Sequence, residues 1–367
     1  MLRPLSFSFS FSFSFSLSFG LAASVCVGLL VPACGGSTAS IGADSGTADD
    51  AGTDGPGLTG EGGADGGVDS AVPGDPLTTV GAFAVNTIFL GETDRAGVPT
   101  KDAWKQYGEN LDGLVTTKTS TDVCKRVAGA DSAKQEDGLN GIDNAFGRTV
   151  LGFLLGLVPT PSKTATDAIA AGNRTILFNL LPGPPRFGML GAEALGSPAT
   201  FVPTEVRSAV ASTVNGGPDS PLSVSSTPSV ASGGVISSGE ASGVFWVEIP
   251  VSGANLRIPV HHARVRMTVL PGSTEATNGT IAGVVPTEEL VTEIAKVAGR
   301  ISTQLCGGST LDTIKQTIRQ ASDILADGTQ DPNKACEAIS IGLGFVAKQV
   351  TAKGIGAQLP PPPDPCR

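Results

Sequence analysis

The densest group of oxygen-bearing side chains in this sequence lies in residues 136–147. Carboxylate and amide oxygens are the ligands that Ca²⁺ prefers, so Asp137, Asn140, Asp143 and Asn144 are candidate calcium ligands. The spacing is not that of an EF-hand, because the alternating acids and the glutamate at the twelfth position are missing. The alternative is turn and capping chemistry, with Asp143 as the N-cap of the apolar segment that follows. The sequence leaves both interpretations open: a calcium ion, or no cofactor.

Carboxylates can also act as general acid and general base in hydrolysis. Asp137, Asp143 and Glu248 would be the residues of such an exported hydrolase. The only two histidines, His261 and His262, are neighbours in an expected strand, where successive side chains point to opposite faces. They would share a metal ion only if a bulge reoriented them. The sequence also has no Gly-x-Ser-x-Gly nucleophile elbow, so no catalytic residue is assigned and a non-catalytic protein is expected.

A cysteine at the end of an apolar amino-terminal segment is a third chemical feature. Arg3 is the only basic residue before Arg95, the stretch after it is apolar, and the small Ala33 precedes Cys34. This order is typical of a secretory signal peptide, here residues 1–33. The cysteine directly after it resembles the lipobox of bacterial lipoproteins. The resemblance implies lipidation of Cys34 and a membrane partner reached through the lipid; glycine rather than aspartate next in the chain implies the outer membrane or cell surface. A plain signal followed by a disulfide cysteine, or a transmembrane helix, are the alternatives.

Four cysteines remain in the rest of the expected mature chain: Cys124, Cys306, Cys336 and Cys366. An even number in an exported chain favours disulfides, and four cysteines allow three connectivities. We favour Cys306–Cys336, which would clip together the helix and loop between them, with Cys124–Cys366 as the second bond. A zinc site is the alternative, but the sequence has no Cys-x-x-Cys.

Charge divides the chain into regions. The sequence has 34 acidic and 24 basic residues, and eight of the acids, with no base, lie in residues 34–78. A segment this acidic and this poor in large apolar residues is expected to be a disordered tether. Residues 79–350 are expected to form one folded domain and 351–367 a proline-rich tail. The folded region is nearly neutral, so it lacks the basic face that nucleic-acid binding needs.

Periodicity predicts the elements of the folded region. Strands are expected at 80–90, 174–181, 280–285 and 339–346. A hairpin is expected from 244–251 and 256–269, with a β-bulge at 261–263, where the alternation changes phase. Helices are expected at 145–157, 164–171, 287–303 and 309–328, the last with Ser309 and Asp312 as a box-like start. Residues 198–243 fit short strands or a mobile loop equally well. The expected class is mixed and mainly β, with β-sandwich or jelly-roll-like sheets and several attached α-helices.

Several stretches together resemble uncharacterised secreted lipoproteins of myxobacterial type: 110–113, 137–147, 277–283, 323–336 and 339–345. The resemblance covers most of residues 80–347. It implies export and a shared domain, and it brings no known activity. With the anchor and the tether, it leads us to expect a non-catalytic lipoprotein that binds a glycan or a protein at the cell envelope. An exported carboxylate-dependent hydrolase and a structural envelope component are the alternatives.

Overall fold

The computed structural model of the protein describes residues 81–156, 158–181, 184–251, 254–357 and 366. The chain divides into two units, Met1–Gly67 and Val68–Arg367, and all described residues belong to the second. The expected signal peptide, Cys34, the acidic tether and the prolines of the tail lie outside the described residues. These assignments therefore stay predictions.

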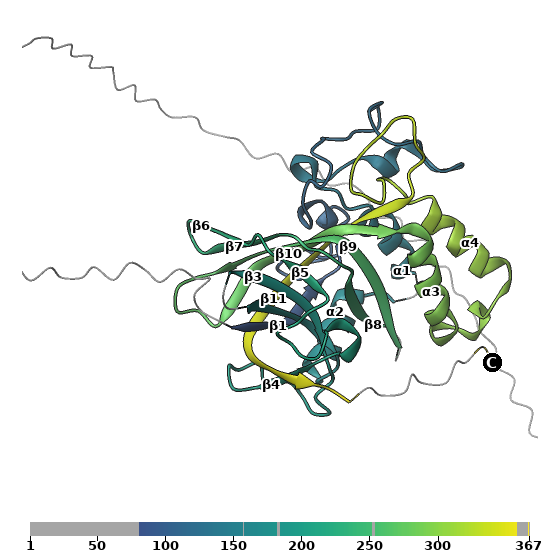
Figure 1. The fold of residues 1–367 in the computed structure, drawn as a ribbon. Helices are drawn as coiled ribbons and strands as arrows, with labels where there is room; N and C mark the ends of the chain where they lie inside the picture. The colour runs from purple at the N-terminus through teal and green to yellow at the C-terminus, as the bar shows by residue number, and fades with distance from the viewer. Residues whose placement is uncertain (1–80, 157, 182–183, 252–253, 358–365, 367) are drawn as a thin grey trace, which may run out of the picture. The chain divides into compact units, whose positions relative to one another are not determined.

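Strands dominate the described residues (Figure 1). In chain order they are β1 (Ala82–Phe89), β2 (Thr175–Leu181), β3 (Arg186–Ala192), β4 (Val206–Ala209), β5 (Ser223–Ser225), β6 (Ser229–Ala231), β7 (Val235–Glu240), β8 (Phe245–Val251), β9 (Ala254–Val269), β10 (Glu275–Pro286) and β11 (Ala338–Ile355). The α-helices are α1 (Leu151–Leu155), α2 (Pro161–Ala170), α3 (Thr287–Ile301) and α4 (Gly308–Arg319). Shorter helical turns are η2 (Ala103–Gln106), η3 (Ser132–Gln135), η4 (Leu139–Gly141), η5 (Phe146–Val150), η6 (Ala211–Thr213) and η7 (Thr303–Leu305). The mainly β class is confirmed, and the finer grouping into a sandwich or jelly roll stays a prediction.

The long strand β11 organises the sheet. One edge of β11 pairs with β1, and the other edge pairs first with β10 and then, in parallel, with β4. The backbone N–H groups of Gln349 and Thr351 both point to this second edge, where they donate to Thr274 and Glu205. Because β1, β2, β3 and β4 also pair in that order, these four strands and β11 close a ring. The sheet then continues from β10 through β9 and β7 to β6.

The expected hairpin is formed by β8 and β9, which pair without interruption from Phe245 opposite Val260 to Val251 opposite Ala254. The expected β-bulge is also present. Along β10 the partners change from Arg264 opposite Ala282 to His261 opposite Val284, so β9 carries an extra residue there. His262 takes the left-handed conformation with φ 51°. The phase change in the sequence was therefore a correct signal of a bulge.

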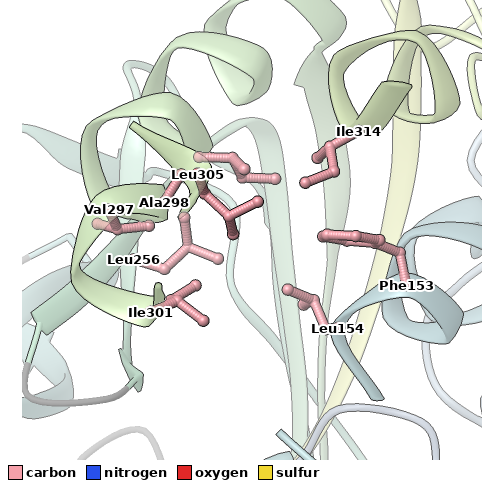
Figure 2. A pocket seen from close by; sticks show the side chains of 9 residues that line it. Phe153, Leu154, Leu256, Val297, Ala298, Ile301, Leu305 and Ile314 are labelled. Atoms are coloured by element: carbon pink, nitrogen blue, oxygen red, sulfur yellow. The ribbon is translucent and has the colours of Figure 1, made fainter. Parts of the chain in front are cut away.

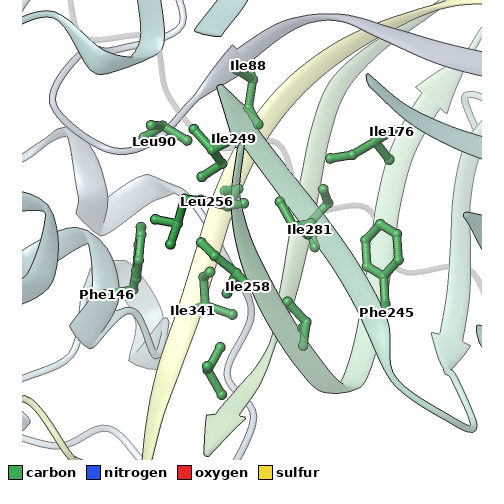
Figure 3. Close-up of a cluster of buried hydrophobic side chains, with 14 of the residues drawn as sticks. Ile88, Leu90, Phe146, Ile176, Phe245, Ile249, Leu256, Ile258, Ile281 and Ile341 are labelled. Atoms are coloured by element: carbon green, nitrogen blue, oxygen red, sulfur yellow. The ribbon is translucent and has the colours of Figure 1, made fainter. Parts of the chain in front are cut away.

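The main core lies between the sheet, the β8–β9 hairpin and the helices. Figure 3 shows Leu256 and Ile258 of the hairpin gathered with Ile341 of β11 and with Phe146. Three phenylalanines make ring contacts with Phe178, whose centroid lies 4.9 Å from that of Phe345, 5.6 Å from that of Phe187 and 6.4 Å from that of Phe245. Tilted pairs of this kind stabilise by about 0.5–1.5 kcal/mol each beyond their burial.

Two of the predicted helices differ in detail from expectation. The segment 145–157 is helical as predicted, but it opens with the π turn η5 before α1. Helix α4 begins at Gly308, after Gly307, so Ser309 lies inside the helix and the predicted Ser309 N-cap is wrong. The helix also ends at Arg319 instead of continuing to residue 328. The Ser322 hydroxyl donates a hydrogen bond to the Arg319 carbonyl, and Ile324 then forms a β-bridge with Ala338 of β11.

Two loop segments, 92–145 and 320–337, lie side by side at one end of the sheet (Figure 1); we call them the loop cap. Lys125 N donates to Lys334 O at 2.7 Å, and Cys336 N donates back to Lys125 O at 2.9 Å. This pairing sets Cys124 beside Cys336, and the two form a disulfide.

The second disulfide joins Cys306, directly after η7, to Cys366. All four cysteines are thus paired, as predicted, but the favoured connectivity is wrong. Closeness along the chain was misleading, because α4 separates Cys306 from Cys336 while the loop cap brings Cys336 to Cys124. Two disulfides are compatible with an exported protein.

Candidate functional site

The structure places the four candidate calcium ligands in different surroundings. Asn144 is buried and serves the backbone: its Oδ1 accepts from Gly147 N and Gly342 N, and its Nδ2 donates to three carbonyls. Asn144 therefore caps the π turn and ties it to β11. Asp143 is not the N-cap that we predicted, because its carboxylate turns away to Leu111 N. Asn140 lies exposed in η4 with φ 56°, a conformation that asparagine tolerates in turns.

Asp137 and Asp143 are brought together, with two carboxylates that the sequence did not point to. Asp112 and Asp323 complete a group that we call the acidic cluster: Asp112, Asp137, Asp143 and Asp323. The charges of Asp112, Asp137 and Asp323 all act on Asp143. The cluster lies in the loop cap, where residues from the two loop segments and the start of β11 meet.

Burial and mutual repulsion shift the proton affinity of the cluster. Burial, and next the charges of Asp112 and Asp323, raise the pKa of Asp143 to about 9. Burial raises the pKa of Asp323 to about 7, although two hydrogen bonds from Ser340 favour its charged form. Burial raises the pKa of Asp137 to about 6, against the backbone N–H of Thr116. At neutral pH part of the cluster therefore holds protons.

Each carboxylate of the acidic cluster also accepts hydrogen bonds from the loop cap or β11. Asp112 accepts from Leu114 N at 2.8 Å and from Gln330 Nε2 at 2.9 Å. Asp143 Oδ2 accepts from Leu111 N at 2.7 Å, and Asp137 Oδ2 accepts from Thr116 N. These hydrogen bonds belong to turns of the loop cap, which was the alternative interpretation to a calcium site. Across the described ranges, no three His, Cys, Asp or Glu side chains already stand in a metal-binding arrangement.

The remaining candidates for acid–base chemistry have other partners. Glu248 on β8 is almost buried and pairs with Arg174 at 3.2 Å and with Arg257 at 3.5 Å. His262 Nδ1 lies 2.8 Å from a Glu240 oxygen, whereas His261 Nε2 lies 3.4 Å from Glu289. The bulge therefore leaves the two histidines with separate carboxylates on the surface.

An apolar slot opens between the helices (Figure 2). Its volume is about 10 Å³, room for about one water molecule, and it is lined by α1, β9, α3, η7 and α4, with Phe153 and Ile314 on one side and Val297 and Ile301 on the other. Phe153 and Ile314 also line a more open depression of about 360 Å³, rimmed by hydroxyl side chains of α4: Ser309, Thr310, Thr313 and Thr317. The apolar stripes of α3 and α4 were visible in the sequence, but nothing in it indicated that they would leave a gap.

In the part of the chain that the structure describes, no helix is both long and apolar enough to cross a bilayer. Comparisons with protein-family models, with curated proteins and with solved structures find no match to this chain.

Proposed function

We propose that this chain is a lipid-anchored protein of the cell envelope whose folded domain is a non-catalytic module that binds another protein. Lipidation of Cys34, the outer-membrane or surface location and kinship with secreted lipoproteins of myxobacterial type are parts of the same proposal. The observation that carries the binding role is the open depression beside α4, with Phe153 and Ile314 at its base and hydroxyl side chains on its rim. Apolar clefts with a few polar groups at the mouth are the usual form of a site that accepts an apolar side chain.

The aromatic residues favour a protein over a glycan as the ligand. Sugars pack their apolar faces on open aromatic rings, and this chain has only two tryptophans and one tyrosine. Tyr107 is fully buried and Trp104 is 6% exposed. The face of Trp246 is covered by Arg257, whose guanidinium carbon lies 4.2 Å from the ring centroid. The depression, in contrast, offers Phe153 and Ile314, which suit contact with a leucine or phenylalanine side chain of a partner.

A hydrolase is the weaker proposal. The charge of Asp137 acts on Asp143, and burial raises the pKa of Asp137 to about 6 and that of Asp143 to about 9, so both can hold a proton as a catalytic acid must. However, Asp143 is only 2% exposed and Asp323 only 7%, so a polymeric substrate has no path to them in this conformation.

Site-directed photo-crosslinking in the producing cell tests the proposed docking site. A photoreactive phenylalanine analogue placed at Thr313, on the rim, is expected to give a discrete adduct with an envelope protein. The same analogue at Lys163, exposed on α2, is the control and is expected to give none. In the Thr313 background, Phe153→Glu places a charge at the base of the depression and is expected to abolish the adduct. Equal adducts at both positions, or no adduct at either, would contradict the proposal.

A further inference from the structure

Strands β1, β2, β3, β4 and β11 carry a second, smaller apolar cluster on the face turned away from the main core. Its strand residues are Ala82, Ala84, Leu177, Leu190, Ala192, Ala209 and Val350. Side chains alternate between the faces of a strand, so Arg207, two residues before Ala209 on β4, points to the side of this cluster. Arg207 is 0% exposed. A guanidinium is therefore buried on an otherwise apolar face.

The guanidinium of Arg207 is paired at one of its three nitrogen atoms. Its Nε donates to Glu205 Oε1 at 2.7 Å, whereas Nη1 and Nη2 are buried without a hydrogen-bond partner. The second oxygen of Glu205 is already occupied, because it accepts from Thr200 N, Thr200 Oγ1 and Phe201 N. Buried N–H groups of a cation cost free energy unless an acceptor binds them. The two Nη groups thus form a vacant pair of donors.

Phe201 covers this pair of donors. The guanidinium carbon of Arg207 lies 5.0 Å from the centroid of the Phe201 ring. Phe201 is partly exposed and Arg207 is not, so the ring separates the cation from solvent on that side. Phe201 also has φ 51°, a left-handed conformation that is strained for a bulky residue. Because residues 196–198 and 202–204 are exposed, Phe201 can swing outward without displacing the core.

We propose that Arg207 binds the carboxylate of a small organic acid, admitted when Phe201 swings aside. Two nitrogen atoms of one planar guanidinium match the two oxygens of a carboxylate. A single cation that already shares its charge with Glu205 suits a ligand with one negative charge better than the dianion of phosphate. The apolar cluster on the same face suits the short alkyl chain of such an acid. This inference does not depend on partner binding at the depression.

Calorimetric titration and thermal unfolding of the purified full chain at pH 7 test the proposal. Sodium propionate is expected to give saturable heat and an unfolding temperature that rises with its concentration. Sodium chloride and sodium phosphate at the same ionic strength are expected to give neither. Arg207→Lys removes the planar fork and is expected to weaken propionate binding by about tenfold or more. Arg186→Lys, exposed at the start of β3, is the matched control and is expected to bind as the unmodified chain does.

A second variant tests the cover. Phe201→Gly removes the ring and places at φ 51° a residue that adopts this conformation without strain, so it is expected to bind propionate several-fold more tightly. An affinity lower than that of the unmodified chain would overturn the role of Phe201. Arg207→Lys keeps a positive charge beside Glu205, so it is expected to fold. If it does not, the titrations of the unmodified chain and of Phe201→Gly still decide.

Three results would overturn the proposal as a whole. Absence of saturable heat in both the unmodified chain and Phe201→Gly would mean that the Nη groups of Arg207 are satisfied by water alone. Equal effects of propionate, chloride and phosphate would show a general response to anions. An unchanged propionate affinity in Arg207→Lys would place the binding site elsewhere on the chain.

Discussion

Asp323 and Ser340 are joined by two hydrogen bonds: Asp323 Oδ1 accepts from Ser340 N at 2.8 Å and Oδ2 accepts from Ser340 Oγ at 2.6 Å. The same Ser340 Oγ accepts from Ala145 N at 2.8 Å. One fully buried hydroxyl thus connects the segment after α4, the start of β11 and the entrance to the π turn. The acidic cluster depends on this connection, because it positions Asp323.

Replacement of Ser340 by alanine is expected to destabilise the protein by about 2–4 kcal/mol, since it leaves the Ala145 N–H and one Asp323 oxygen buried without a partner. The free energy of unfolding, from denaturant titration followed by circular dichroism, measures the effect. Ser309→Ala, at an exposed position in α4, is the control and is expected to stay within about 0.5 kcal/mol of the unmodified chain. Equal stability of the two variants would contradict the network described here.

The Asp143 carboxyl is expected to make stability fall with rising pH when no calcium is present. Its folded-state pKa of about 9 lies above the value of 3.8 for the free side chain. Below pH 3.8 the Asp143 carboxyl is protonated in both the folded and the unfolded chain, so it does not lower the free energy of unfolding. As pH rises from there to 9, the unfolded chain ionises and the folded chain does not, and stability declines by up to about 1.4 kcal/mol per pH unit. Asp137 and Asp323 titrate in the same place, and the charges of Asp112 and Arg148 act there too, so the slope belongs to the whole cluster.

Asp143→Asn removes this charge and is expected to be more stable than the unmodified chain at pH 8 in chelator, by a margin that shrinks toward pH 5. Denaturant titrations at several pH values measure it. Asp167→Asn, at an exposed position, is expected to show no such trend. A margin that is constant with pH would show that Asp143 is ionised in the folded protein.

Features set by local sequence could be predicted well. The β8–β9 hairpin follows from alternation over two neighbouring runs, and the bulge at His262 follows from a change in that alternation. Helix α3 follows from its apolar stripe, in which Leu290, Ile294 and Val297 are all buried. Each of these patterns is complete within one or two adjacent segments, so no long-range contact is needed to read it.

Features set by long-range pairing could not be predicted. Asp112 and Asp323 meet because β11 and the loop cap bring distant segments together, and neither residue has a local pattern that distinguishes it from other turn aspartates. Residues 198–243 proved to contain the short strands β4 to β7, whose pairing partners decide their structure more than their own composition does. Strand β3 was not predicted either, because its glycines weaken the local β signal.

The disulfide connectivity can be checked directly. Proteolysis without reductant, followed by mass spectrometry, is expected to give linked peptides for Cys124–Cys336 and for Cys306–Cys366. The first bond closes a loop of 212 residues in sequence. In the chain-entropy model such a bond stabilises by about 5.4 kcal/mol, so Cys124→Ala with Cys336→Ala is expected to lower stability strongly. A linked Cys306–Cys336 peptide would contradict the structure.

The anchor proposed at Cys34 leads to a prediction about location. A sulfur is needed for acylation, and a chain with two or three acyl groups stays on a membrane whereas a folded domain without them does not. Cys34→Ser is therefore expected to move the protein from the membrane fraction to the soluble exported fraction and to change the mass of its amino-terminal peptide. Cys306→Ser with Cys366→Ser is the control, because it also removes sulfur but leaves the expected lipidation site intact. Retention of the Cys34→Ser chain in the membrane fraction, with processing unchanged, would mean that the protein is held there by something other than lipid on this residue.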